Sequence, residues 1–396
     1  MRKILFISKY LTTSKNGFES RLSTLISLFN KNNYEVTAIT SSLSLKKFKF
    51  QKKYTHKKIN NVSYYFVREK NDYSLYSFQR IISWIKFEFN VFNFNYKKIP
   101  FKPDVIYISS LSLLTILNGI YLKKRFKAKL VFEMRDLWPY FLYTTGKFSK
   151  INPFVVLLGL IEKYGIYQSD LIVGLIPKIK QYINYRGFYT KKVFASTFPV
   201  NKNFFINNKS HTINLDNKYF NICYAGNFGF DNHLNDLLGL TSEIQNKSFM
   251  FHFFGDGSQK QNLKNKFSYL KNVKFYDHVD YKDLHSILVK MDCLIVSFGF
   301  SNKYPIFGYE LNKLNNYLMA SKPIIVIGKK ENLSKNRGEF IFVTKNNSLI
   351  FEKKLISIKS NYNFFLKIAK KNKKKLLLRN NPNAIFKKTV NNLRNL

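Results

Sequence analysis

A lysine in the first turn of an expected helix is the clearest chemical signal in this sequence. In the stretch IFGYELNKLNNYLMASKPIIVIG, Gly308 precedes a helix that we predict over residues 310–320. Its first turn contains Glu310, Asn312 and Lys313. A helix N-terminus attracts anions, and a nearby ammonium group strengthens that attraction. The arrangement predicts a diphosphate site in which Lys313 neutralises the charge and Asn312 donates a hydrogen bond.

Two further turns of similar type precede this one along the chain. In ICYAGNFGFDNHL, Gly226 and Gly229 flank Asn227 directly after a strand-like run and before a helix. Small residues in such a turn let backbone amides face a phosphate, although each turn alone is equally typical of a structural loop. Three such turns at successive strand ends favour a nucleotide at the carboxyl edge of one sheet. In FFGDGSQKQNL the corresponding residues are Gly255, Asp256, Gly257 and Lys260.

A fourth polar stretch, RDLWP, follows the apolar run of residues 129–134. Arg135, Asp136 and Trp138 stand where a buried strand is expected to end. A polar loop after a core strand is the simpler interpretation. The alternative is a ligand site, because open α/β sheets bind ligands at the carboxyl ends of their strands.

Strand-like runs alternate with helix-length segments through the whole chain, and continuous apolar strands of this kind indicate parallel sheets covered on both faces. We expect two successive Rossmann-like halves. Strands are predicted at 3–8, 34–40, 62–68, 104–110, 129–134, 170–175, 192–197, 219–226, 249–255, 273–277, 293–298, 323–328 and 339–344. Helices are predicted at 19–32, 74–95, 112–123, 153–168, 232–245, 258–268, 281–290, 310–320, 352–377 and 383–396.

The charge of the chain points to an anionic partner. Its 396 residues include 66 Lys and Arg against 23 Asp and Glu, a formal net charge of +43. Such a field attracts nucleic acid, an anionic membrane surface or phosphorylated small molecules. The segment 74–95 has apolar residues at helical spacing, so it is either a helix that covers the core or a face for a membrane or lipid-linked acceptor.

Several other chemistries lack support in the sequence. Cys223 and Cys293 lie in apolar runs and form no zinc pattern, and the six histidines show no metal spacing. There is no DxD triplet, nucleophile elbow or P-loop. The N-terminal apolar run is too short for a signal peptide, and no window has the ~18 apolar residues of a spanning helix. We therefore expect a cytoplasmic protein.

The order of the motifs YAGNFG, FFGDGSQKQNL, VKFYDHV and GYELNKLNNYLMASKPII resembles the donor domain of retaining GT-B glycosyltransferases of family four. RDLWP is similar to a motif of a bacterial subgroup that transfers amino sugars in O-antigen and capsule assembly. The resemblance covers nearly the whole chain. It implies an α/β fold of GT-B type, with two Rossmann-like domains facing across a cleft and C-terminal helices crossing back to the first domain. It also implies catalysis without a metal or other cofactor.

The resemblance assigns roles to individual positions. Asn227 and Gly229 would line the diphosphate and Lys313 would pair with it. Gly17, in SKNGFESRL, matches the loop where glycine lets the backbone approach the donor. In the first domain Asp136 would orient the acceptor hydroxyl, next to Arg135 where many relatives have histidine, and Trp138 would offer a flat surface to a sugar ring. The strand end at RDLWP would then face donor and acceptor.

The sequence departs from the family pattern at several positions. Relatives carry two carboxylates eight positions apart around the nucleotide-binding helix, and here those positions are Gly308 and Asn316. Asn316 replaces the acid that accepts hydrogen bonds from the ribose. Glu310 replaces a small serine and brings a negative charge close to a diphosphate. Asn227 stands where many members have arginine. Because of these departures, an inactive or specialised enzyme remains an alternative.

We expect a retaining, metal-independent glycosyltransferase. It would move a sugar, HexNAc or deoxy amino sugar, from a UDP-linked donor to a lipid-linked glycan acceptor in surface polysaccharide (O-antigen or capsule) biosynthesis. It would be peripheral on the inner face of the cytoplasmic membrane, bound to its anionic surface. The alternatives are a catalytically weakened GT-B scaffold and a basic nucleic-acid-binding protein, although no specific nucleic acid is expected. The expected parts are an acceptor domain at 1–198, a linker at 199–218, a nucleotide-sugar domain at 219–375 and a returning helix at 376–396.

Overall fold

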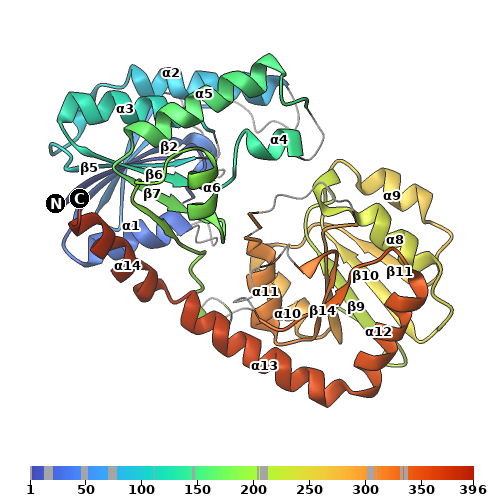
Figure 1. Cartoon of the computed structure of the whole chain (residues 1–396). Coiled ribbons are helices and arrows are strands. Elements are labelled where there is room, and N and C mark those ends of the chain that lie inside the picture. The colour runs from blue at the N-terminus through green and yellow to red at the C-terminus, as the bar shows by residue number, and fades with distance from the viewer. Residues whose placement is uncertain are drawn as a thin grey trace. The chain divides into compact units, whose positions relative to one another are not determined.

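The chain forms two compact units in the computed structural model. The first comprises residues 1–199 together with 382–396, and the second comprises residues 200–381 (Figure 1). The described residues are 2–12, 21–45, 52–69, 78–110, 112–144, 148–202, 205, 213–300, 307–308, 310–330, 333 and 338–396.

The first unit is built on an eight-stranded sheet in the order β3-β4-β2-β1-β5-β6-β7-β8. Its central strands are mostly buried and rich in apolar residues, as expected for a parallel sheet covered on both faces. β1 lies parallel to both β2 and β5, with Leu5 opposite Thr37 on one side and Ile106 on the other. The strands are β1 (Lys3–Ile7), β2 (Glu35–Ser41), β3 (Tyr54–Ile59), β4 (Val62–Val67), β5 (Val105–Ser110), β6 (Lys129–Met134), β7 (Leu171–Gly174) and β8 (Val193–Ala195).

The edge strand β3 was not predicted, and it is antiparallel to β4. The expectation of a sheet made only of the predicted parallel strands is therefore wrong at this edge. The turn between β3 and β4 is Asn60–Asn61, and both residues have positive φ, 49° and 62°. Asparagine tolerates this conformation, which matches the twist of a two-residue hairpin. Lys57 and Lys58 in β3 concealed the strand pattern but suit an exposed edge.

Helices cover both faces of this sheet (Figure 1). One face carries α2 (Phe78–Phe92), α3 (Thr115–Phe126) and α5 (Pro153–Gln168), and the other carries α1 (Arg21–Lys31) and α14 (Pro382–Arg394). The C-terminal helix thus belongs to the first unit, where its Phe386 packs edge-on against Phe29 of α1 at 5.0 Å between ring centroids. Two short helices that were not predicted, α4 (Tyr140–Thr144) and α6 (Ile179–Tyr185), follow strands β6 and β7.

The second unit has a six-stranded, wholly parallel sheet in the order β11-β10-β9-β12-β13-β14. One core forms between the sheet and helices α8, α9 and α12, and a second forms between the sheet and α10, α11 and α13. The strands are β9 (Phe220–Ala225), β10 (Phe249–Phe254), β11 (Val273–Tyr276), β12 (Cys293–Ser297), β13 (Ile324–Ile327) and β14 (Ile341–Val343). The helices are α8 (Leu234–Ser242), α9 (Lys260–Lys266), α10 (Tyr281–Leu288), α11 (Asn312–Ala320), α12 (Ser348–Ser360) and α13 (Tyr362–Arg379).

The single helix predicted at 352–377 is wrong, because α12 ends at Ser360 and α13 begins at Tyr362. Asn361 separates them with non-helical backbone angles, φ −112° and ψ 36°. Asparagine favours helix ends because its side chain competes for backbone hydrogen bonds, and here it donates to the carbonyl of Ser357 at 3.2 Å. No helix among the described residues is long and apolar enough to cross a bilayer.

Candidate functional site

The turns after β9 and β10 pack backbone against backbone. The amide of Phe228 donates to the carbonyl of Asp256 at 2.9 Å, and the amide of Gly226 donates to Phe254 at 3.0 Å. Gly255 has φ +139°, and a Cβ there would lie 1.9 Å from the carbonyl oxygen of Gly226. Only glycine fits this position. The two predicted glycine turns are therefore one continuous structure at the carboxyl edge of the sheet.

Asn227 occupies the exposed top of this double turn. Its backbone carbonyl accepts a hydrogen bond from the Tyr224 hydroxyl at 2.8 Å. A Cβ on Gly257, which has φ +153°, would lie 2.3 Å from Asn227 Oδ1, and one on Gly229 would lie 3.1 Å from its Nδ2. The glycines thus leave room for the Asn227 amide, which is free to meet a ligand above the turns.

Lys313 lies beside these turns, in the first turn of α11. Its ammonium group is 4.8 Å from the centroid of the Tyr224 ring and donates to Asn232 Oδ1 at 2.5 Å. A Cβ on Gly226 would lie 3.4 Å from Lys313 Cδ, so the lysine chain runs along the first turn. Within the described residues no carboxylate forms an ion pair with Lys313, and burial lowers its pKa to about 7. The group is a cation without a counter-ion at a helix N-terminus, the environment of an anion site.

The residues around the start of α11 have distinct surroundings. Gly308 is buried with φ +80°, a conformation that favours glycine. Asn312 begins the helix and accepts from Asn315 Nδ2 at 3.4 Å. Asn316, one turn later, is buried.

Glu310 is not an isolated negative charge. Its side chain is 6% exposed, and Oε1 lies 3.7 Å from Nη2 of Arg379, near the end of α13. The guanidinium of Arg379 thus offsets the negative charge of Glu310, which the sequence analysis placed close to the expected diphosphate. The main objection to phosphate binding at this helix is therefore weakened.

Lys260 and Asp256 are engaged elsewhere in the second unit. Lys260 Nζ donates to Asp277 Oδ1 at 2.7 Å, at the end of β11. Asp256 is exposed and accepts from the amide of Gly257 at 2.7 Å, which stabilises the turn. The structure thus brings Lys313 together with the Gly226–Gly229 turn, whereas Lys260 forms its own ion pair.

In the first unit the RDLWP residues follow β6. Arg135 is half-buried and Asp136 is exposed. Trp138 packs edge-on against Trp84 of α2, with 5.8 Å between ring centroids and an angle of 84°. Both tryptophans of the chain therefore meet at the carboxyl edge of this sheet.

This tryptophan pair continues into a larger aromatic cluster. Trp84 Nε1 donates to the Tyr10 hydroxyl at 2.7 Å, just after β1. The guanidinium of Arg80 lies over the rings of Tyr10 and Trp84, 5.6 Å from each centroid. Tyr10, Arg80, Trp84 and Trp138 form the aromatic cluster of the first unit, a surface that suits a sugar ring or another flat polar group.

A buried ion pair supports the strand that leads to RDLWP. Arg21 Nε donates to Glu133 Oε2 at 2.8 Å, and both side chains are almost fully buried. Tyr107 and Ser109 donate to the two carboxylate oxygens at 2.6 and 2.8 Å. Burial opposes ionisation of Glu133, but Arg21 and the hydroxyl donors outweigh it and lower its pKa. Gly17, four positions before Arg21 in the sequence, lies outside the described residues.

Sequence reasoning missed the partners of the predicted residues. Tyr224 had the pattern of an ordinary strand residue, and Asn232 stood unremarked in the stretch that contains Asn227. Arg379 and Tyr10 carried no signal, and Trp84 was noted only as part of the 74–95 segment. No cluster of three or more His, Cys, Asp or Glu that could hold a metal occurs among the described residues.

No family model matches the chain, and no curated protein matches it in sequence. Solved structures do match along its whole length. Sucrose-phosphate synthase from Thermosynechococcus elongatus has a TM-score of 0.75 at 11% identity, covering 100% of this chain and 99% of that one. HepE from Anabaena, solved with UDP and glucose, has a TM-score of 0.68 at 10% identity, with 100% of each chain covered. The lipopolysaccharide outer core galactosyltransferase WaaB, in its apo form, has 0.58 at 14%, with 99% of each covered.

These structures share the GT-B fold, and this chain therefore has that fold. The prediction of an α/β protein with two Rossmann-like, parallel-sheet units is confirmed.

Proposed function

We propose that the protein is a retaining glycosyltransferase of the family-four type, with the donor half of its site in the second unit and the acceptor half in the first. The observation that carries this proposal is Lys313, which lies beside the double glycine turn and forms no ion pair with any carboxylate of the described residues. The similar structures add support, since HepE was solved with UDP and with UDP-glucose and WaaB is a galactosyltransferase.

The donor would bind through its diphosphate. Lys313 and the amides at the start of α11 would hold the diphosphate, with Asn227 and Asn312 within the same neighbourhood. Negative charge grows on the leaving UDP as the bond to the sugar breaks, and preorganised positive groups stabilise that charge more in the transition state than in the ground state. This accounts for catalysis by the chain's own residues, without a metal.

The acceptor would bind at the end of β6. Trp138 would lie against a sugar ring, and Asp136, exposed at the strand end, would orient the attacking hydroxyl beside Arg135. When the acceptor hydroxyl attacks the anomeric carbon from the same face from which the leaving group departs, the configuration is retained. The sugar transferred would be a HexNAc or a deoxy amino sugar, and the acceptor a lipid-linked glycan of surface polysaccharide assembly. The charge of +43 would hold the protein at the inner, anionic face of the cytoplasmic membrane.

The test is UDP release from a panel of UDP-sugars, with and without a lipid-linked acceptor, followed by determination of the anomeric configuration of the product. The proposal predicts acceptor-dependent UDP release from at least one amino sugar donor and an α product from an α-linked donor. A product of inverted configuration would refute the retaining mechanism. Firm UDP binding without turnover on any donor would instead favour the catalytically weakened scaffold.

A further inference from the structure

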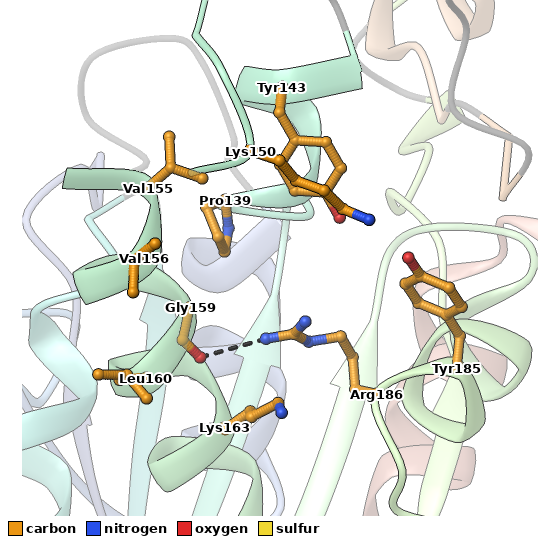
Figure 2. A pocket seen from close by; sticks show the side chains of 10 residues that line it. All are labelled: Pro139, Tyr143, Lys150, Val155, Val156, Gly159, Leu160, Lys163, Tyr185 and Arg186. Carbon is orange, nitrogen blue, oxygen red and sulfur yellow. Dashed lines mark hydrogen bonds between the residues drawn. The ribbon is translucent and has the colours of Figure 1, made fainter. Parts of the chain in front are cut away.

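The first unit contains a hollow that none of the roles above uses. It has a volume of about 410 Å³ and lies between α5 and the neighbourhood of α4 and α6 (Figure 2). Pro139 lines it and directly follows Trp138 in the chain, so the hollow adjoins the aromatic cluster. Its lining residues are Pro139, Tyr143, Lys150, Val155, Val156, Gly159, Leu160, Lys163, Tyr185 and Arg186.

Three cations line this hollow, and none of its lining residues is acidic. Figure 2 shows the charged ends of Lys150, Lys163 and Arg186 turned toward the open space. Lys150 and Lys163 are exposed, and neither forms an ion pair with a carboxylate in the part of the chain that the structure describes. The two exposed ammonium groups therefore attract an anion.

The nearest carboxylate is withdrawn from the hollow. Glu162 lies on the buried side of α5, where Tyr182 donates to it and Arg186 Nε lies 2.8 Å from Oε2. Arg186 also donates through Nη2 to the carbonyl of Gly159 at 3.1 Å. The guanidinium is thereby fixed at the wall of the hollow, and Glu162 does not repel an anion that enters it.

The outer face of α5 is apolar beside the hollow. Leu160 is 60% exposed and Val156 46%, and both line the hollow. Exposed apolar and aromatic side chains continue along the same helix and its preceding turn, namely Ile151, Leu157, Tyr164 and Tyr167. Glu162 is the one acidic residue of α5, so the exposed face of this helix carries no negative charge.

Helix α2, which packs against α3, shows the same pattern. Ile85, Phe89 and Phe92 are exposed, whereas its one acidic residue, Glu88, is buried and accepts from Thr115 and Asn118 of α3. Of the 22 large apolar or aromatic side chains exposed among the described residues, 12 lie between residues 82 and 167. Exposed apolar side chains beside exposed lysines, as on α5, are typical of a site for an anionic amphiphile.

We propose that the hollow binds the phosphate group of a polyisoprenyl-phosphate-linked acceptor, whose hydrocarbon chain lies along the exposed apolar row of α5. This inference rests on the proposed function and gives it a location. Lys150 and Lys163 neutralise the phosphate and Arg186, held by Glu162, forms the polar wall beside it, while Val156 and Leu160 contact the first isoprene units. Because Pro139 and Trp138 are adjacent residues, the sugar attached to that phosphate reaches the aromatic cluster.

The experiment uses the full chain and farnesyl phosphate as the probe, below its critical micelle concentration. Inorganic phosphate and farnesol are the partial probes. Binding is followed by the fluorescence of Trp84 and Trp138, which are the only tryptophans and lie near the hollow. We expect farnesyl phosphate to bind at least tenfold more tightly than either partial probe. Lys163→Gln and Leu160→Ser should each weaken it at least fivefold.

Matched controls distinguish binding in the hollow from nonspecific electrostatic or hydrophobic binding elsewhere on the surface. Lys31→Gln, at the exposed end of α1, and Leu349→Ser, 63% exposed on α12, should leave the affinity unchanged. Equal affinity for inorganic phosphate would overturn the proposal in favour of a simple anion site. Unchanged binding in both hollow variants would overturn it outright. If phosphatidylglycerol vesicles compete as well as farnesyl phosphate does, the surface binds a bilayer and the hollow is not a substrate site.

The same variants distinguish failure of this inference from failure of the proposed function. Titration with UDP reports on the second unit alone and should give wild-type affinity in Lys163→Gln and Leu160→Ser. Farnesyl phosphate binding without UDP binding would remove the donor proposal and leave the hollow as a lipid phosphate site. UDP binding with no farnesyl phosphate binding would remove only the inference made here.

Discussion

The ammonium group of Lys313 lies 4.8 Å from the centroid of the Tyr224 ring and 3.3 Å from its hydroxyl oxygen. Its other partner is the amide of Asn232. Both partners are neutral, so they position the cation without cancelling its charge. A diphosphate arriving at the start of α11 would therefore meet an amino group that is already positioned and whose positive charge, when protonated, is not cancelled by these partners.

The affinity for UDP should fall as the pH rises above about 7. Burial lowers the pKa of Lys313 to about 7, so the free protein loses this proton at higher pH, whereas the complex requires it. Binding then takes up a proton, and linkage predicts a loss of about tenfold per pH unit between about pH 7.5 and 9. Calorimetric titration across this range measures the effect.

Lys313→Arg is the control for that pH profile. A guanidinium stays protonated throughout the range, so the decline should disappear in this variant even if its affinity differs. A wild-type affinity that is constant from about pH 7 to 9 would show that Lys313 does not supply the charge.

Arg379→Ala should weaken UDP binding although Arg379 is assigned no contact with the nucleotide. The substitution leaves Glu310, whose side chain is 6% exposed, without the guanidinium 3.7 Å away and close to the expected diphosphate. A loss of about tenfold is expected, corresponding to about 1.4 kcal/mol. The double variant Arg379→Ala/Glu310→Gln should recover most of the affinity. Equal loss in the single and double variants would mean that Arg379 acts in another way.

Trp138→Ala should reduce transfer to the acceptor and leave donor binding intact. Its ring contacts Trp84 in the first unit, whereas Lys313 and the glycine turns belong to the second unit. Loss of one aromatic contact with a sugar ring should lower kcat/KM for the acceptor by about tenfold. Trp138→Phe should retain most activity. Steady-state kinetics at saturating donor give the comparison, and a matching loss of UDP affinity would indicate unfolding instead.

Glu133→Ala should destabilise the first unit by about 3 to 5 kcal/mol, because it leaves the buried guanidinium of Arg21 unpaired. Tyr107→Phe, which removes one donor to the same carboxylate, should cost roughly 1 to 2 kcal/mol. Both tryptophans lie in this unit, so tryptophan fluorescence during urea unfolding follows it selectively. A wild-type midpoint for Glu133→Ala would contradict the importance of the pair.

The same pair predicts an acid dependence. The folded pKa of Glu133 is lowered, so its stabilisation is present above the ordinary glutamate pKa of about 4.3 and is lost as the pH falls through the folded value. The urea midpoint of the first unit should decrease below about pH 4.5, and this decrease should be smaller in Glu133→Gln.

Much of the fold was predictable because each strand can be recognised from a short stretch of sequence. Runs such as residues 129–134 and 249–254 are mostly apolar, and their length and composition are typical of buried strands. The edge strand β3 was not predicted because its lysines, which suit a strand edge exposed to solvent, interrupt the apolar pattern. The break at Asn361 escaped because no proline or glycine marks it and apolar residues continue on both sides.

The candidate site was predictable only where its residues are close in sequence. The glycine turns and the lysine at the start of α11 follow from their neighbours along the chain. The contact of Lys313 with Asn232 spans 81 residues, and the contacts of Glu310 with Arg379 and of Trp84 with Trp138 also join distant segments. Such contacts depend on how helices pack on the sheets, which no single stretch of sequence encodes.

The most direct test of the donor site is calorimetric titration of the wild type and Lys313→Ala with UDP and with UMP at about pH 7. Charge-assisted hydrogen bonds contribute about 1.5 to 3 kcal/mol, so Lys313→Ala should weaken UDP by roughly 10- to 150-fold. It should change UMP, which lacks the second phosphate, by no more than about twofold, and Lys353→Ala on the exposed side of α12 should change neither. Equal UDP affinity in the wild type and Lys313→Ala, with both folded, would contradict the donor site.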